Sequence, residues 1–259
     1  MREGHESNRP TMPVFAGARW KRLGLHLKGH LFLFPSRPAP AYESRSGNRL
    51  LLIFIFMEGI LGPRLSLFEL LRLPVPPVWL RVPVLLGLAL VLVRYFARLS
   101  PAQIGLHAWR EWSLTEKSYF LQAFVIANIV FAVILANQLR MILADAGLWG
   151  PAAVTVGTNL LWGFHQELMY RGILQTELVR RWGSWRGILV STVLFTFGPL
   201  HFYHFLRNGP WAAMPVLSGI FVTGLLLGIL FRTSGNLFMV GALHGLGNAY
   251  MDGLHNLRR

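Results

Sequence analysis

The sequence predicts an all-α fold, a polytopic membrane helical bundle with about seven transmembrane helices. Hydrophobic residues make up 53% of the 259 residues and charged residues only 14%, whereas an ordinary soluble domain carries about 25% charged residues. The mean hydropathy is +0.45. Apolar runs of roughly 20 residues, the length that crosses the hydrocarbon as a helix, recur along the chain. Too little polar surface remains for a soluble protein of this size.

The first 48 residues differ in composition from the rest of the chain. Residues 1–48 are rich in Arg, Lys, Gly, Pro and Ser and show no sustained helical period. This composition predicts a basic, mostly disordered cytoplasmic tail. Residues 49–259 then form the predicted transmembrane domain.

The transmembrane domain contains seven candidate spans, which are expected at residues 49–71, 78–97, 119–141, 151–170, 185–204, 211–231 and 235–252. The first span is the weakest, because Glu58, Gly62, Pro63 and Arg64 interrupt its apolar run. We therefore expect a broken or re-entrant helix there.

Net charge and its distribution indicate the partners and the orientation. The formal net charge is +14, but the basic residues lie mainly in the tail and in short loops between apolar runs. That distribution favours contact of the basic tail with anionic lipid and a cytoplasmic N-terminus, and it argues against binding of nucleic acid. We expect a multi-pass protein of a bacterial cell (inner) membrane. The chain has no cysteine, which excludes disulfides, thiolate zinc sites and cysteine nucleophiles.

Two pairs of small residues predict close helix contacts. Gly224 and Gly228 form a GxxxG pattern in the sixth span, and Gly241 and Gly245 form another in the seventh. Small residues at this spacing let helix backbones approach closely. The glycines are therefore expected to bring His244 near its neighbouring helices.

Polar residues in three of the last four spans mark a candidate site. Glu167 and Arg171 are four residues apart and can form an ion pair on one helix face. His244 and Asn248 share this spacing, as does His201 with Phe197. Three helices are thus expected to present polar edges to a common interior, and ionisable groups at membrane depth indicate function.

Each group also has a structural interpretation. The Glu167 and Arg171 pair can simply stabilise its helix, His201 can belong to an interfacial aromatic belt, and His244 with Asn248 can be interhelical hydrogen-bond partners. Acting together, a carboxylate and an imidazole can deprotonate a water while another imidazole and an amide stabilise an oxyanion. Alternatively, Glu167, His201 and His244 can ligate zinc.

Three motifs in this order resemble the CPBP family, the CAAX-protease and bacteriocin-processing intramembrane proteases. They are Gln166-Glu167-Leu168-Met169-Tyr170-Arg171, Phe197-Gly198-Pro199-Leu200-His201 and His244-Gly245-Leu246-Gly247-Asn248. The resemblance covers residues 158–248, the motif core of the domain.

The resemblance implies an Abi-like glutamic endopeptidase that works without a cofactor, with zinc as the weaker alternative. It implies that Arg171 holds the first motif in place, that His201 helps to bind water, and that His244 and Asn248 stabilise the oxyanion. The implied substrate is a peptide or protein in the membrane, either membrane-associated, lipidated or bearing a C-terminal sorting tail.

Gln166 departs from the family pattern, because it occupies the place of the first glutamate, which is taken as the general base. An amide cannot accept a proton at physiological pH. Glu167, about 100° further round the helix, or the adjacent His165 can serve instead. The alternatives are a catalytically inactive immunity or scaffold protein and a small transporter, although no internal inverted repeat supports transport.

Overall fold

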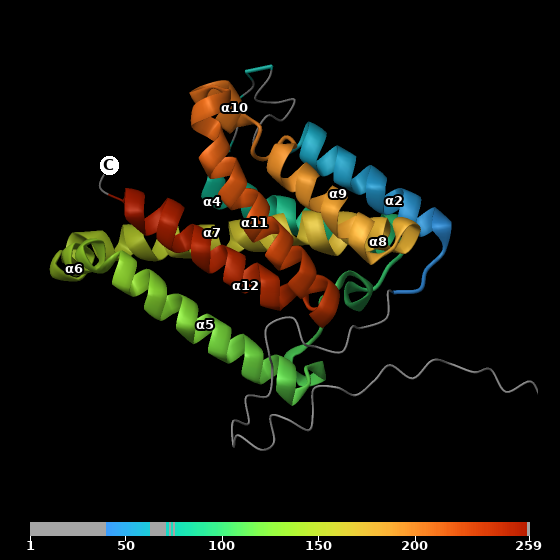
Figure 1. Ribbon diagram of the computed structural model, residues 1–259, viewed down its shortest axis with the longest axis horizontal. Coiled ribbons are helices and arrows are strands. Elements are labelled where there is room, and N and C mark those ends of the chain that lie inside the picture. Colours follow the sequence, from blue (N-terminus) through green and yellow to red (C-terminus); the bar gives the residue numbers. More distant parts are fainter. Residues whose placement is uncertain (1–39, 63–70, 73, 75, 258–259) are drawn as a thin grey trace, which may run out of the picture.

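The computed structural model describes residues 40–62, 71–72, 74 and 76–257, and these form helices and no strands, which confirms the all-α class (Figure 1). The α-helices are α2 (Ser44–Ile55), α4 (Val78–Val91), α5 (Leu114–Ile134), α6 (Ala136–Ala144), α7 (Trp149–Glu167), α8 (Thr176–Trp182), α9 (Ser184–Phe197), α10 (Tyr203–Asn208), α11 (Pro210–Ser234) and α12 (Leu237–Asn248).

Wider, π-helical segments extend several of these helices. They are η2 (Phe56–Ile60) after α2, η3 (Leu92–Phe96) after α4, η7 (Leu168–Gln175) between α7 and α8, and η8 (Ala249–Gly253) after α12. Short 3₁₀ turns complete the connections: η4 (Pro101–Ile104), η5 (Trp109–Glu111), η6 (Ala146–Leu148) and η9 (Leu254–Asn256). The π-helical segment η7 carries most of the first motif. Such segments inside α-helices occur frequently at functional sites, so we expect a functional site near η7.

Three helices of the described part are long and apolar enough to cross a membrane, namely Val78–Phe96, Leu114–Ile134 and Pro210–Ser234. Much of the apolar surface of α5 is exposed, with Val133 at 72%, as expected of a helix that faces lipid. The chain is therefore a membrane protein, while the exact count of seven spans is not confirmed. The predicted first span corresponds to a helix over Ser44–Ile60, and its residues 63–70 lie outside the described part.

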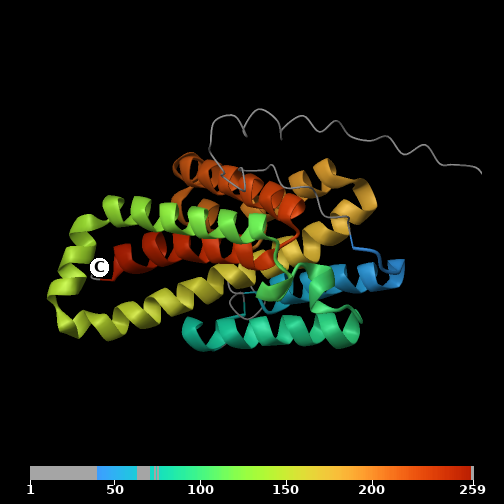
Figure 2. The same ribbon diagram turned by 90° about the horizontal axis from the view of Figure 1, so that it is seen from below.

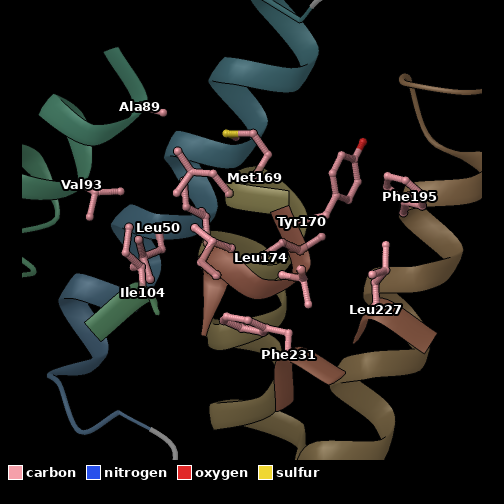
Figure 3. Packing of buried hydrophobic residues seen from close by; sticks show 14 of the residues in the cluster. Leu50, Ala89, Val93, Ile104, Met169, Tyr170, Leu174, Phe195, Leu227 and Phe231 are labelled. Carbon is pink, nitrogen blue, oxygen red and sulfur yellow. The ribbon is translucent and has the colours of Figure 1, made fainter. Parts of the chain in front are cut away.

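The segment η7 lies at the centre of the packed helices. Figure 3 shows Met169, Tyr170 and Leu174 between α2 and α4 on one side and α9 and α11 on the other. All three side chains are buried. The helix that carries the first motif is therefore held on both sides by the main hydrophobic core.

Helix α12 lies between α7 and α5 (Figure 2), and glycine allows its close approach to α7. A Cβ atom built on Gly163 would lie 2.4 Å from the backbone of Gly245. A Cβ atom on Gly241 would lie 2.5 Å from the Phe164 ring. The predicted close packing at Gly241 and Gly245 is thus confirmed.

The turn before α12 sets the position of the third motif. Gly235 ends α11 in the left-handed conformation with φ 62°, which glycine adopts without steric cost. The Asn236 side chain then accepts a hydrogen bond from the Phe238 backbone N–H at 3.1 Å and caps α12. This short connection folds α12 back along the bundle and directs His244 towards α7.

Candidate active site

Gln166 and Glu167 are adjacent but face different surroundings. Both side chains are buried, with exposures of 3% and 0%. Gln166 lines a cavity of about 660 Å³, whereas Glu167 is absent from its lining and lies behind it. Of these two side chains, the Gln166 amide is therefore the one that faces the cavity, and the Glu167 carboxylate lies outside its lining.

The Glu167 carboxylate bridges a histidine and an arginine. Its Oε1 lies 2.6 Å from Nδ1 of His244, and its Oε2 lies 3.2 Å from Nε of Arg171. The predicted ion pair between Glu167 and Arg171 is therefore present. The contact with His244 joins residues 77 positions apart in the sequence, and it connects α7 to α12.

Arg171 is fixed by further contacts with α9 and α11. Its Nη2 donates to the Gly224 carbonyl oxygen at 2.8 Å, and its guanidinium lies 4.4 Å from the centroid of the Phe195 ring. One turn later, Gln175 Nε2 donates to the Gly228 carbonyl oxygen at 2.8 Å. The two glycines of the sixth span therefore present accessible carbonyls to η7. These contacts fit the expectation that Arg171 holds the first motif in place.

Asn248 pairs with the amide that replaces the expected glutamate. Its Nδ2 donates to Oε1 of Gln166 at 3.0 Å, and both residues line the cavity. Because Oε1 of Gln166 accepts this hydrogen bond, the side chain can offer its amide N–H groups to the cavity as donors.

His201 reaches the cavity from a turn and not from a helix face, which corrects the expected α-helical pairing with Phe197. Helix α9 ends at Phe197, and the Phe197 ring is 40% exposed. Gly198 takes an extended conformation, as the residue before a proline prefers. His201 Nδ1 instead contacts the Phe195 carbonyl oxygen at 2.7 Å. A carbonyl oxygen only accepts, so Nδ1 carries the proton of this contact, and in the neutral ring Nε2 is the nitrogen that can accept.

The cavity lining contains both polar and apolar side chains. Its polar lining includes Gln166, His201, His204, Thr223, His244, Asn248 and Asp252. Its apolar lining includes Trp162, Phe195, Leu200, Val216, Ile220, Leu226, Leu227, Leu243 and Met251. The three motifs thus contribute to one pocket, although they are spread over about 80 residues of sequence.

The zinc alternative gains no support from this arrangement. Within the described part of the chain, no group of three or more His, Asp or Glu side chains is placed to hold a metal ion. Glu167, the carboxylate of the alternative ligand set with His201 and His244, directs its oxygens at His244 and Arg171. Metal dependence stays a prediction to be tested.

Sequence reasoning missed Phe195, which organises the site. Its ring centroid lies 4.7 Å from that of His201 and 5.7 Å from that of His244, in addition to its contact with Arg171. It also missed Asp252, one turn beyond Asn248 on the cavity wall. A signal existed for Asp252, since an acidic residue four positions after a motif residue shares its helix face.

His165, the other suggested substitute for the base, does not reach the cavity. Its side chain is 1% exposed and is absent from the cavity lining. Its ring stacks on Trp162 with centroids 6.0 Å apart. The geometry therefore gives it no access to a substrate.

Comparison with protein families supports the motif assignment. Residues 147–250 match the family model described as Type II CAAX prenyl endopeptidase Rce1-like. The match includes α7, the first motif, the second motif in the turn after α9 and the third motif on α12, and it confirms the resemblance to CPBP intramembrane proteases. No curated protein and no solved structure matched the chain.

Proposed function

We propose, from the match of residues 147–250 to the family model described as Type II CAAX prenyl endopeptidase Rce1-like, that the protein is an intramembrane endopeptidase in which His244 activates water. The observation that carries the proposal is the contact of 2.6 Å between Glu167 Oε1 and His244 Nδ1. In this proposal Glu167 orients His244 and does not contact the water.

The contact with Glu167, which also pairs with Arg171, fixes which nitrogen of the His244 ring donates a hydrogen bond. A carboxylate only accepts hydrogen bonds, so Nδ1 carries the imidazole proton and Nε2 holds the lone pair. His244 lines the cavity, where this lone pair can serve as a base.

In the proposed reaction, Nε2 of His244 takes a proton from a water molecule as the water oxygen forms a bond to the scissile carbonyl carbon. The imidazolium that forms is stabilised by Glu167, as a buried carboxylate stabilises the histidine of serine-protease triads. His244 then returns the proton to the amide nitrogen of the leaving peptide as the C–N bond breaks. The products are a new carboxyl terminus and a new amino terminus.

The remaining polar groups position the reacting atoms. The Gln166 N–H groups can donate to the oxyanion, because Asn248 already occupies Oε1 of the amide. Nε2 of His201 can accept the second proton of the water in a hydrogen bond, since its Nδ1 donates to the Phe195 carbonyl. Amide donors aimed at an oxyanion are worth about 2.7–4 kcal/mol each in other enzymes.

The apolar lining of the cavity supports a membrane-associated substrate. Val216, Ile220 and Leu226 of α11 and Leu243 of α12 line the same cavity as the polar motif residues. Such a lining can hold an apolar side chain, a lipid group or part of a hydrophobic tail next to the scissile bond. We therefore propose that the cleaved bond lies near the membrane-embedded or lipidated end of a protein.

The test is quantitative analysis of new peptide termini in membranes of cells that carry wild-type protein or variants at equal abundance. Loss of the same termini in His244→Ala and their decrease in Glu167→Gln would support the proposal. His255→Ala is the matched control, because this histidine lies on η9 and outside the cavity lining. Cleavage by His244→Ala at the wild-type rate would overturn the assignment of the base.

A catalytically inactive scaffold is the second candidate function, favoured by the observation that an amide pair, Gln166 with Asn248, fills the general-base position. It predicts identical termini for wild type and His244→Ala. It also predicts that any cellular phenotype of the protein survives this substitution. The same experiment therefore separates the two candidates.

A further inference from the structure

Three arginines gather at one end of the bundle, away from the candidate active site. Arg45 and Arg49 lie four residues apart at the start of α2, and Arg98 follows the end of η3. Together they line a cavity of about 340 Å³, here named the arginine pocket. Its other lining residues are Tyr42, Glu43, Ser46, Leu99 and Gln103.

The charge of the arginine pocket is not balanced by the described protein groups. Within residues 40–62 and 76–257, no carboxylate forms an ion pair with Arg45, Arg49 or Arg98, and Glu43 is the acidic residue of the lining. Like charges four residues apart on a helix repel each other. An anion bound between them would remove this repulsion.

Nearby arginines show a different arrangement. Arg180 and Arg181 both donate to the buried carboxylate of Glu177, which also accepts a hydrogen bond from Tyr42 at 2.9 Å. Among the residues that the structure describes, this end of the bundle therefore supplies a buried acidic partner for Arg180 and Arg181 and none for the arginine pocket.

The backbone at Arg98 is strained. Its φ of 59° lies in the left-handed region, where a side chain other than glycine is disfavoured. Among described residues, Gly105, Gly183, Gly209 and Gly235 hold the other positive φ angles together with Arg72. The strained turn closes the helix end, since the Leu99 N–H donates to the Val93 carbonyl at 3.1 Å. A glycine would close it without strain, so the arginine side chain calls for a separate explanation.

The position of the pocket relative to the membrane indicates the ligand. Arg98 lies two residues beyond the apolar helix Val78–Phe96, one of the three helices able to cross a membrane. The Arg49 guanidinium lies 5.4 Å from the centroid of the Phe96 ring at the end of that helix. The pocket is therefore level with the end of a span, where lipid phosphates lie.

We propose that the arginine pocket binds the phosphate of an anionic phospholipid headgroup at the membrane surface. Guanidinium groups recognise phosphate oxygens through paired hydrogen bonds, and basic pockets between helices on the cytoplasmic side are suited to anionic headgroups. The predicted cytoplasmic N-terminus places this pocket in the leaflet that carries them. The proposal is independent of the peptidase proposal, since no pocket residue lines the catalytic cavity.

The experiment is native mass spectrometry of the full-length protein in detergent micelles, titrated with dioctanoyl phosphatidylglycerol. Arg49→Gln and Arg98→Gly are each expected to weaken binding about tenfold, the loss of a charge-assisted contact. Arg110→Gln is the matched control, because it removes the same charge from an arginine outside the pocket. It should leave the affinity unchanged.

Arg98→Gly also keeps the test independent of misfolding. Since glycine accepts the left-handed backbone, this variant should unfold at a temperature no lower than that of the wild type while it binds the lipid more weakly. Equal weakening by Arg110→Gln would show general charge attraction and overturn the proposal. Equal binding of dioctanoyl phosphatidylcholine, or protection from thermal unfolding by inorganic phosphate at the same concentration, would also overturn it.

Discussion

Replacing Gly163 with alanine should separate the two helices that carry the candidate active site. The added Cβ would lie 2.4 Å from the Gly245 backbone, whereas carbon atoms in contact lie about 3.5–4.0 Å apart. The helix axes must therefore move apart by about 1 Å. Overpacking of this kind costs up to about 3 kcal/mol, and the higher helix propensity of alanine offsets about 1 kcal/mol. The expected net loss of stability is about 2 kcal/mol.

Gly157→Ala is the matched control on the same helix. A Cβ atom there meets no atom within 4 Å, so the variant should gain about 1 kcal/mol from helix propensity alone. The two alanine variants should thus differ by about 3 kcal/mol. At 2–4 °C per kcal/mol, this difference separates their unfolding temperatures by about 6–12 °C.

Gly163→Ala should lower the cleavage rate more strongly than it lowers the stability of the fold. Gly163 lies one turn before Glu167, and Gly245 follows His244 directly. Moving the helices apart by about 1 Å breaks the hydrogen bond between Glu167 and His244, because donor and acceptor then exceed about 3.5 Å. A displacement of this size can cost about 100-fold in rate.

The assay is thermal unfolding in detergent, followed by circular dichroism, together with release of the termini that the wild type produces. Gly163→Ala should unfold at a lower temperature than Gly157→Ala and lose cleavage at temperatures where both are folded. If the two variants have the same unfolding temperature and the same cleavage rate, the backbone contact between α7 and α12 does not determine the geometry of the candidate active site.

Three further outcomes are expected. Burial raises the pKa of the Glu177 carboxyl, but hydrogen bonds from two arginines and a tyrosine outweigh it and hold the pKa below its ordinary value of 4.5. The stabilisation of the fold by the ionised Glu177 carboxylate is therefore complete above pH 4.5 and is lost as the pH falls through the lower pKa of the folded state. Glu177→Gln should unfold at a lower temperature than the wild type at about pH 7. This difference in unfolding temperature should disappear in acid. Arg171→Met should lose about 3–5 kcal/mol, because it leaves the buried Glu167 carboxylate without its arginine. Adding Glu167→Gln should restore part of this loss in the same unfolding assay, and no restoration would refute the pairing. Cleavage by protein dialysed against EDTA should equal that of untreated protein, and recovery of lost activity by zinc would instead favour the metal alternative.

Local spacing predicted some contacts of the site and not others. The pair of Glu167 with Arg171 follows from a separation of four residues on one helix, and the structure contains it. The contact of Glu167 with His244 joins residues 77 positions apart. The helical periodicity of α7 and α12 does not predict which residue of another helix contacts Glu167. The close approach of Gly163 on α7 to Gly245 on α12 allows this contact. The GxxxG pattern predicts close packing at Gly245 but does not identify Gly163 as its neighbour.

His201 shows a second limit of sequence reasoning. Its spacing from Phe197 matches one helical turn, but Gly198 and Pro199 end α9 before the turn is complete. The side chain then enters the cavity from a connecting turn and contacts Phe195 instead. The sequence therefore contains a helix stop signal, Gly198 followed by Pro199. The direction in which this stop turns the His201 side chain is seen only in the structure.

Substitution of Gln166 by glutamate distinguishes the possible bases, because it changes one group and leaves the packing nearly the same. Asn248 Nδ2 can still donate to an oxygen at position 166, so the bond across α7 and α12 survives. The amide N–H donors are replaced by an acceptor oxygen. If His244 is the base and Gln166 stabilises the oxyanion, Gln166→Glu must lower cleavage, since a carboxylate repels a developing negative charge. If position 166 is where a base belongs, the same substitution must raise cleavage above wild type, and the assignment of His244 as the base then fails.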